Sequence, residues 1–96
     1  MLFAVIRHDK PNSVGLRQST RPKHLEYLEG VMRCITGGGA LLDDAGQQIG
    51  SILFIEVADR AAAEHFAATD PFDSAGLFAS THIQPFRQVF KDGARI

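Results

Sequence analysis

The stretch Arg21-Pro22-Lys23-His24-Leu25 decides most of what this sequence predicts about its fold, together with Asp70-Pro71-Phe72 further along the chain. Thr20 can cap a helix that carries the first proline inside its initial turn. The second proline disfavours helical backbone at the residue before it, so a second helix should end near Asp70. The sequence therefore predicts an imidazole, that of His24, near the start of one helix and a carboxylate near the end of another.

Apolar residues recur at helical spacing after His24, which predicts that the first helix packs one stripe against the core. The stripe consists of Leu25, Leu28, Met32 and Ile35. The run Gly37-Gly38-Gly39 is expected to end this helix, since glycine is common at helix C-termini. It is not interpreted as a phosphate-binding loop, because the Lys and Ser or Thr of such a loop do not follow it. The single cysteine, Cys34, lies beside the stripe and is interpreted as a small core residue.

Short apolar runs predict four strands. The run Leu2 to Ile6 is continuous rather than alternating, as is typical of a strand covered on both faces. Two strands, Ala40 to Leu42 and Ser51 to Val57, flank a polar turn and are expected to form a hairpin. The last segment, Phe78 to Phe90, is interrupted by Pro85 and suits a strand at a sheet edge.

The second helix is expected to start after Asp59, a good N-cap, and to run to about Thr69. Its predicted buried side consists of Ala62, Ala63, Phe66 and Ala67. The resulting order, βαββαβ, is that of an α+β ferredoxin-like domain, in which a four-stranded antiparallel sheet carries two helices on one face. Residues 1–96 are expected to form a single domain. The uncovered sheet face would expose apolar side chains, so a face-to-face homodimer is expected.

Composition excludes several classes of function. The chain is 45% hydrophobic and has a net charge of −1, with basic and acidic residues mixed along it, so nucleic acid is not an expected partner. Its apolar runs are too short to cross a membrane and no targeting segment is evident, which predicts a cytoplasmic protein. The histidines His8, His65 and His82 show no metal-binding spacing. No cofactor or metal is expected, and only a loose group of His8, Asp9 and His24 offers any metal geometry.

His24 and Asp70 form the first candidate for chemistry. An imidazole can exchange a proton at neutral pH, and a carboxylate bonded to its other nitrogen would fix its tautomer. The alternative is structural: a partly exposed helix histidine, and an aspartate that bonds backbone amides in the turn before Phe72. In an ideal domain of this type the two helices are parallel, which puts the start of one far from the end of the other. Contact then requires a fold-back after Pro71, an earlier helix start or a second subunit, and Asp9 remains a competing partner.

Binding roles are predicted for a few further residues. Arg17 and Arg21 lie where guanidinium groups could hold an anionic or phenolate-like ligand, although both could equally lie on a solvated helix face. Phe72 is a possible pocket wall, whereas Phe78 and Phe86 are interpreted as packing residues. The expected ligand is therefore a small anionic or phenolic molecule.

With these residues in place, the sequence resembles the YciI-like (YCII-related) proteins from Leu2 to Phe90. The matching positions are Asp9-Lys10, Arg17, Arg21-Pro22, His24-Leu25, Gly50, Asp70-Pro71-Phe72, Ala75-Gly76, Ile83 and Pro85-Phe86. The resemblance implies a ferredoxin-like fold that pairs into a dimeric α+β barrel, with a His and Asp centre at His24 and Asp70. One branch of the family looks like it contains a dehydrochlorinase that acts on a chlorinated hydroxyquinol, whereas most members have no assigned reaction. The glycine run Gly37-Gly38-Gly39 and the region from Ala40 to Gly50 depart from the family pattern, which implies a different substrate if this hairpin lines the pocket.

Two functional hypotheses follow. The first is a small homodimeric enzyme in which His24 is the general acid and base, Asp70 or Asp9 orients it, and Arg21 contacts an anion. Its substrate would be a small cyclic or conjugated organic acid or phenol, and its chemistry that of a lyase, isomerase or dehydrochlorinase. The second is a non-catalytic module of the same fold that binds a small molecule or a partner. Fold analogy alone does not separate the two hypotheses.

Overall fold

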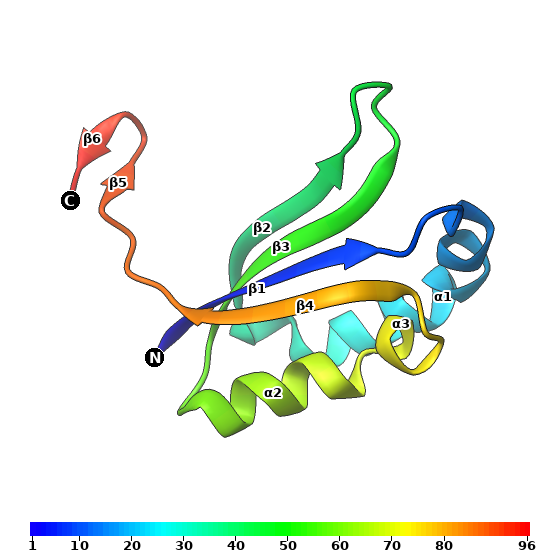
Figure 1. Cartoon of the computed structure of the whole chain (residues 1–96). Coiled ribbons are helices and arrows are strands. Elements are labelled where there is room, and N and C mark those ends of the chain that lie inside the picture. The colour runs from blue at the N-terminus through cyan, green and yellow to red at the C-terminus, as the bar shows by residue number, and fades with distance from the viewer.

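The computed structural model describes all residues, 1–96, and shows one central sheet with helices on one of its faces (Figure 1). The sheet is antiparallel with the strand order β2-β3-β1-β4. Its strands are β1 (Leu2–Asp9), β2 (Ile35–Leu42), β3 (Gln48–Glu56) and β4 (Phe78–Pro85). The helical elements are α1 (Val14–Val31), the 3₁₀ turn η1 (Met32–Cys34), α2 (Arg60–Thr69) and α3 (Pro71–Ser74). The predicted α+β ferredoxin-like arrangement is confirmed.

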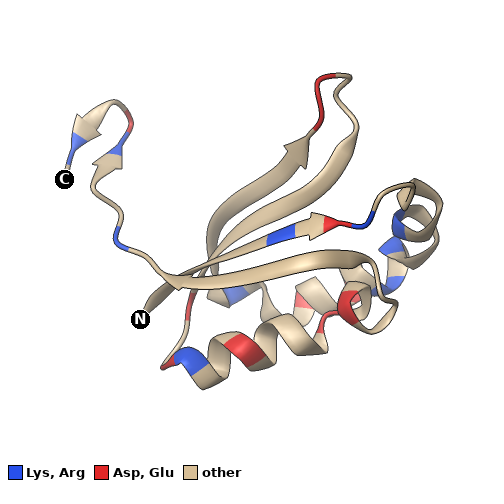
Figure 2. Ribbon diagram, in the orientation of Figure 1, with Lys and Arg blue, Asp and Glu red and all other residues tan.

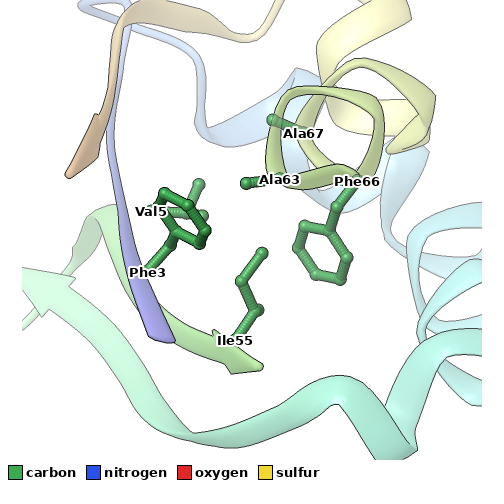
Figure 3. Close-up of a cluster of buried hydrophobic side chains, with 6 residues drawn as sticks. All are labelled: Phe3, Val5, Ile55, Ala63, Phe66 and Ala67. Atoms are coloured by element: carbon green, nitrogen blue, oxygen red, sulfur yellow. The ribbon is translucent and has the colours of Figure 1, made fainter. Parts of the chain in front are cut away.

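The core lies between the sheet and α2, as Figure 3 shows. Alternate residues of β1, Phe3 and Val5, point to the helix side and pair across the ladder with Ile55 and Leu53 of β3. On α2 the buried residues are Ala63, Phe66 and Ala67, as predicted, while Ala62 is only partly buried. Small alanines let the helix approach the sheet closely, and the phenylalanines fill the space that remains.

The ends of α2 follow the predicted chemistry. The side chain of Asp59 accepts a hydrogen bond of 2.9 Å from the N–H of Ala62, as an N-cap residue should. Asp70 has extended backbone, with φ −65° and ψ 128°, because Pro71 excludes helical backbone at that position. Asp70 therefore ends α2 and at the same time caps the short helix α3, which turns the chain back towards α1.

The first helix begins earlier than predicted. It starts at Val14, after a turn in which Asn12 has a positive φ of 59°, and not after Thr20. Pro22 consequently lies in the helix interior, where it removes one backbone hydrogen bond. It is exposed there, so water can solvate the carbonyl that loses its partner. This earlier start moves His24 from the helix end to its middle.

The apolar stripe predicted for this helix is also largely wrong. Leu25 and Met32 are exposed, at 42% and 58% of their full accessible surface. The side that faces the protein carries mostly polar residues instead, among them Arg17, His24 and Tyr27. Cys34 is half-buried in η1 and is not one of the core residues, which is also contrary to expectation.

The run Gly37-Gly38-Gly39 does not end the helix but lies inside β2, which begins at Ile35. Gly38 has a φ of +139°, and a Cβ atom on it would lie 2.3 Å from the backbone oxygen of Ile52. Only glycine fits this close approach of two strands. The predicted role of this run as a helix terminator is wrong. The glycines instead allow an irregular strand to pair with β3.

The last strand is shorter than predicted. β4 ends at Pro85, and the chain then leaves the sheet as a separate small hairpin made of β5 (Phe90–Lys91) and β6 (Ala94–Arg95). Residues 86–96 are called the C-terminal arm below. In Figure 1 the arm extends away from the body on the side of the sheet opposite to the helices.

The sheet face opposite the helices carries apolar side chains and has no cover within the chain. Its residues from β1 and β3 alternate with those of the core and are Leu2, Ala4, Ile6, Ile52 and Phe54. Phe86 from the arm covers one end, with its ring centroid 4.6 Å from that of Phe54. None of the helices has both the length and the apolar character that crossing a bilayer requires.

Candidate functional site

The structure brings His24 and Asp70 into direct contact within one chain. Nδ1 of His24 lies 2.9 Å from Oδ1 of Asp70, although the two residues are 46 positions apart in the sequence. Two of the anticipated routes to contact operate together: α1 starts early, and α3 folds the chain back at Pro71. Asp9, the competing partner, is not used by the histidine.

Asp70 is held in place from several directions and is only 3% exposed. The backbone N–H of Phe72 donates a 2.9 Å hydrogen bond to the same Oδ1 atom that meets His24. The second carboxylate oxygen, Oδ2, lies 3.7 Å from a guanidinium nitrogen of Arg7. An aspartate oxygen that already accepts a backbone amide and lies near a guanidinium is placed to accept hydrogen bonds. It can therefore act as an acceptor towards the imidazole.

Arg7 is buried at the centre of this site. Its guanidinium donates to Oδ1 of Asp73 at 2.8 Å, to the carbonyl oxygen of Ala67 at 3.1 Å and to Oγ1 of Thr81 at 3.2 Å. Burial lowers the pKa of the Arg7 guanidinium, and the nearby carboxylates of Asp70 and Asp73 act in the opposite direction. Because arginine titrates so far above neutral pH, the group stays charged. It also stacks over the ring of Phe78, at 4.0 Å from the ring centroid.

The aromatic ring of Phe72 forms a wall beside the histidine. It is buried, and its centroid lies 4.1 Å from that of the imidazole, with the two rings stacked. The guanidinium of Arg17 lies 4.7 Å from the same phenylalanine ring. Stacking restricts rotation of the imidazole, so that Asp70 and Phe72 together fix both its position and its plane.

A second contact fixes the helix that carries His24. The hydroxyl of Tyr27 on α1 donates a 2.7 Å hydrogen bond to the carbonyl oxygen of Phe66 on α2, and Thr69 donates to the same hydroxyl at 3.0 Å. Burial raises the pKa of the Tyr27 phenol, while its bond with Thr69 acts in the opposite direction. The two helices are thereby tied one turn away from the His24 and Asp70 contact.

A small cavity of about 140 Å³ adjoins His24 and Asp70. Its lining residues come from the sheet and from all three helices: Val5, Arg7, His24, Leu28, Gly39, Gln48, Ser51, Leu53, Phe66, Asp70, Phe72 and Phe78. Most of its wall is apolar or aromatic, and a few polar groups converge on it. This composition is typical of small-molecule sites.

Two of the polar groups in the cavity lining belong to His24 and Ser51. Nε2 of His24 has no hydrogen-bond partner within the chain, since the contact with Asp70 uses Nδ1. In the tautomer whose Nδ1–H donates to Asp70, Nε2 of the ring keeps a lone pair. Ser51, which pairs with Arg7 across the ladder, adds a hydroxyl to the lining. The arrangement can accept a proton from a ligand and return it to another atom.

The other predicted binding residues lie apart from this cavity. Arg17 forms a two-pronged ion pair with Asp9, with distances of 2.7 and 2.8 Å, and neither side chain lines the cavity. Arg21 is exposed and does not line it either. Asp9 instead borders a wider, polar cleft of about 400 Å³ between the β1–α1 loop and the β2–β3 hairpin, which reaches neither His24 nor Asp70.

The structure does not assemble the loose metal group considered from the sequence. No set of three or more His, Cys, Asp or Glu side chains converges anywhere in the chain. The carboxylate of Asp9 is engaged by Arg17 rather than turned towards His8 and His24. At this position the structure shows a hydrogen-bonded pair, His24 and Asp70.

Sequence reasoning missed Arg7, Gln48 and Ser51. A signal for Arg7 did exist, because it continues the inward alternation of Phe3 and Val5 along β1. A charged residue at a core-facing position is expensive unless it is paired, so it marks a site or a buried network. Nothing comparable singles out Ser51, which only the strand register places opposite Arg7.

Comparison with known proteins places this geometry in a family. Residues 1–87 match the YCII-related domain. The chain is 31% identical to the protein YciI of Escherichia coli, and the alignment spans 94% of this chain and all of that protein. An uncharacterised protein of Haemophilus influenzae is 30% identical over the same shares.

Two solved structures share the fold. One is a 5-chloro-2-hydroxyhydroquinone dehydrochlorinase from Burkholderia phenoliruptrix in complex with 2,5-dihydroxybenzoquinone. It has a TM-score of 0.84 and 35% identity, covering 91% of this chain and 94% of the other. The second, an antibiotic biosynthesis monooxygenase, has a TM-score of 0.50 and 16% identity, with 92% and 100% covered, and supports the fold alone. Both share the α+β fold of this chain, a four-stranded antiparallel sheet with helices. By sequence and by structure, the chain belongs to the YCII-related domain family.

Proposed function

We propose that this protein is a small homodimeric enzyme that uses His24 as general acid and base on a single-ring phenol or quinone. The observation that carries the proposal is the 2.9 Å contact between Nδ1 of His24 and a buried Asp70, beside a cavity that the imidazole lines. Perturbed or fixed acid–base groups next to a cleft are a recurring feature of active sites. Asp70 then acts as the residue that orients the imidazole.

The size of the cavity limits the substrate to one ring. Its volume is about 140 Å³, and an apolar cavity of about 150 Å³ holds one benzene molecule. The aromatic walls provided by Phe72 and Phe78 suit a flat ring. The buried cation of Arg7 and the hydroxyl of Ser51 lie on the sheet side, where they can meet ring oxygens. This inventory favours a hydroxylated ring over an aliphatic acid.

The chemistry we propose is proton transfer coupled to elimination or isomerisation. In an elimination, Nε2 of His24 accepts a proton from the ring or one of its hydroxyls, and a leaving group departs from the ring with its bonding electron pair. The net loss is one acid molecule, and no oxidant is consumed. In an isomerisation, the same proton returns to a different atom of the ring. Asp70 stabilises the imidazolium that forms in either case.

The relative with the same fold supports this class of substrate. The dehydrochlorinase of Burkholderia phenoliruptrix is similar over nearly the whole chain and was solved with 2,5-dihydroxybenzoquinone. A ring of that size is compatible with the cavity beside His24. The region expected to depart from the family pattern, Gly37 to Gly50, contributes Gly39 and Gln48 to the lining. The substituents that this protein accepts are therefore expected to differ from those of the relative.

The homodimer is proposed from the uncovered sheet face. Leu2, Ile6, Ile52 and Phe54 lie on that face, and a second copy placed on it would remove them from water. Each 100 Å² of apolar surface so buried is worth about 2.5 kcal/mol before the cost of association. Membership of the YCII-related domain family supports this pairing, since the resemblance to that family implies a dimeric α+β barrel.

The proposal is tested by offering the protein single-ring substrates and following their conversion. We expect release of chloride from 5-chloro-2-hydroxyhydroquinone or a related chlorinated hydroxyquinol, or isomerisation of a non-chlorinated one followed by its absorbance spectrum, at rates well above the uncatalysed background. A two-ring analogue such as a naphthoquinone should neither bind nor react, because it exceeds the cavity. Binding of 2,5-dihydroxybenzoquinone without turnover of any compound in such a panel would instead establish a non-catalytic binding module.

A further inference from the structure

The C-terminal arm, residues 86–96, contacts the body of the chain through Phe86, but its hairpin of β5 and β6 pairs with no other strand. Asp92 and Gly93 both have positive φ, 52° and 76°, which gives the tight turn that two-residue hairpins prefer. The ladder of β5 and β6 forms a sheet by itself. A lone two-stranded hairpin is marginal in water, so a well-formed one indicates a missing packing partner.

The arm also exposes large apolar side chains. Val89, Phe90 and Ile96 are 45%, 67% and 68% exposed. Between the arm and the end of the sheet lies a hollow of about 330 Å³. It is lined by Leu2, Thr36, Gly37, Gly38, Phe54, Phe86, Gln88 and Phe90. This hollow continues the uncovered sheet face, since Leu2 and Phe54 belong to both.

The β2–β3 hairpin presents a matching feature at the opposite end of the sheet. Leu42 and Ile49 flank its turn and are 57% and 40% exposed. The turn itself carries Asp43 and Asp44. The arm begins where β1 begins, because the N–H of Phe86 donates to the carbonyl oxygen of Leu2, whereas the β2–β3 turn lies beyond the other end of β1. Figure 1 shows the two hairpins at the two ends of the sheet.

The charges of these two hairpins are complementary. Three of the ten basic residues and one of the eleven acidic residues lie in the arm, so the arm has a net charge of +2 and residues 1–85 have −3. Figure 2 shows basic positions along the arm and acidic positions at the β2–β3 turn. In a symmetric pair the arm can meet either the other arm or the other turn. Like charges oppose the first arrangement, and opposite charges favour the second.

We infer that the arm clasps a second copy of this chain, with Phe90 against Leu42 and the basic residues of the arm against the Asp43-Asp44 turn of that copy. The symmetry of the pair produces this contact twice. The inference rests on the homodimer proposed above and is independent of the proposed chemistry. It also places the arm of one copy on the hairpin that carries Gln48 and Ser51, two residues that line the cavity of the other.

The first test changes the apolar contact and measures the dimer dissociation constant by sedimentation equilibrium over a range of concentrations. Phe90→Ser and Leu42→Ser should each raise this constant about 100-fold, because every substitution acts twice in the dimer. Met32→Ser is the matched control, since Met32 is 58% exposed on the helix face and should leave the constant within about twofold. Equal weakening by all three, or by none, would overturn the inference.

The second test exchanges charges. Asp44→Lys and Arg95→Glu should each weaken the dimer about 3- to 10-fold at low salt, and the double variant should restore it. Asp44 is chosen over Asp43 because the latter side chain accepts hydrogen bonds from Ala45 and Gln47 within the turn. Additive weakening in the double variant contradicts the arm-to-turn contact. A wild-type protein that is monomeric at about 100 μM would refute the homodimer itself. A dimer that stays intact in all variants would refute only the contact between the arm and the β2–β3 turn.

Discussion

Asp70 accepts two hydrogen bonds on one oxygen, from the Nδ1 atom of His24 and from the backbone N–H of Phe72, each at 2.9 Å. The aspartate therefore connects the imidazole on α1 rigidly to the turn that begins α3. Phe72 contributes a second time, because its ring stacks on the same imidazole. Rigid support of this kind is what a general base requires if its nitrogen is to stay within reach of a substrate proton.

Replacing Asp70 by Asn should lower turnover far more than it lowers ligand affinity. The amide has the shape of the carboxylate but no charge, so it cannot stabilise an imidazolium and can select the wrong tautomer of His24. We expect kcat to fall about 10²- to 10⁴-fold in steady-state assays. Asp9→Asn is the matched control, because Asp9 pairs with Arg17 outside the cavity. Equal effects of the two variants on kcat would argue that Asp70 has only a structural role.

Replacing Arg7 by Met should destabilise the fold. The variant keeps an aliphatic chain of similar length but leaves the buried carboxylate of Asp70 without its cation. Breaking a buried pair by removing one partner costs about 3–5 kcal/mol. The free energy of unfolding in urea measures the loss. The double variant Arg7→Met with Asp70→Asn should recover part of it. A double variant as unstable as the sum of both single variants would show that the two groups do not interact.

The phenol of Tyr27 should make stability fall at alkaline pH. Burial raises its folded-state pKa above the ordinary value of 10.0, so the unfolded chain loses this proton first as the pH rises. The folded state then binds more protons than the unfolded state. Above about pH 10 the free energy of unfolding therefore decreases, by at most about 1.4 kcal/mol per pH unit. Below that pH the contribution is fully present.

Tyr27→Phe isolates this effect. The variant loses the hydrogen bond to the carbonyl of Phe66 and should be about 1 kcal/mol less stable at neutral pH. The difference in the free energy of unfolding between the variant and the wild type should then shrink as the pH rises above about 10. Urea unfolding at several pH values measures both curves. A constant difference across this range would contradict the raised pKa.

Gly38 should tolerate no side chain. Its φ of +139° and the 2.3 Å that would separate a Cβ atom from the oxygen of Ile52 both oppose alanine. Gly38→Ala is expected to cost about 3 kcal/mol or more of folding free energy. Gly37→Ala is the control, since the nearest atom to its Cβ would be 4.0 Å away on Phe54, and it should cost less than about 1 kcal/mol. Thermal unfolding of both variants decides the matter, and equal melting temperatures would show that the strands can separate there.

Much of the fold could be predicted from residues that follow general rules. The apolar run of β1, the cap at Asp59, the small inward face of α2 and the extended backbone before Pro71 each have one strong physical preference. Their combination leads to the βαββαβ order, and the structure confirms it. The sequence also predicts His24 and Asp70 as a candidate pair, and the structure brings them into contact.

The errors of sequence reasoning concentrate in α1 and β2, and both have a physical cause. The inward face of α1 carries Arg17, His24 and Tyr27, so it has no hydrophobic period from which its true start at Val14 could be recognised. Pro22 is usual in a first turn and rare in a helix interior, which made the later start the better prediction. In β2 the glycines serve a close strand approach that depends on β3 and is invisible locally. Secondary-structure rules fail most often where residues are required for a site rather than for the local helix or strand.

The central claim is that His24 moves a proton, and the most direct measurement separates turnover from binding. In His24→Ala, kcat should fall about 10²-fold or more while the affinity for 2,5-dihydroxybenzoquinone changes little, because ring walls and Arg7 remain. His65→Ala, an exposed histidine on α2, should behave as wild type in both measurements. Unchanged turnover in His24→Ala, with the fold intact by circular dichroism, would contradict the account.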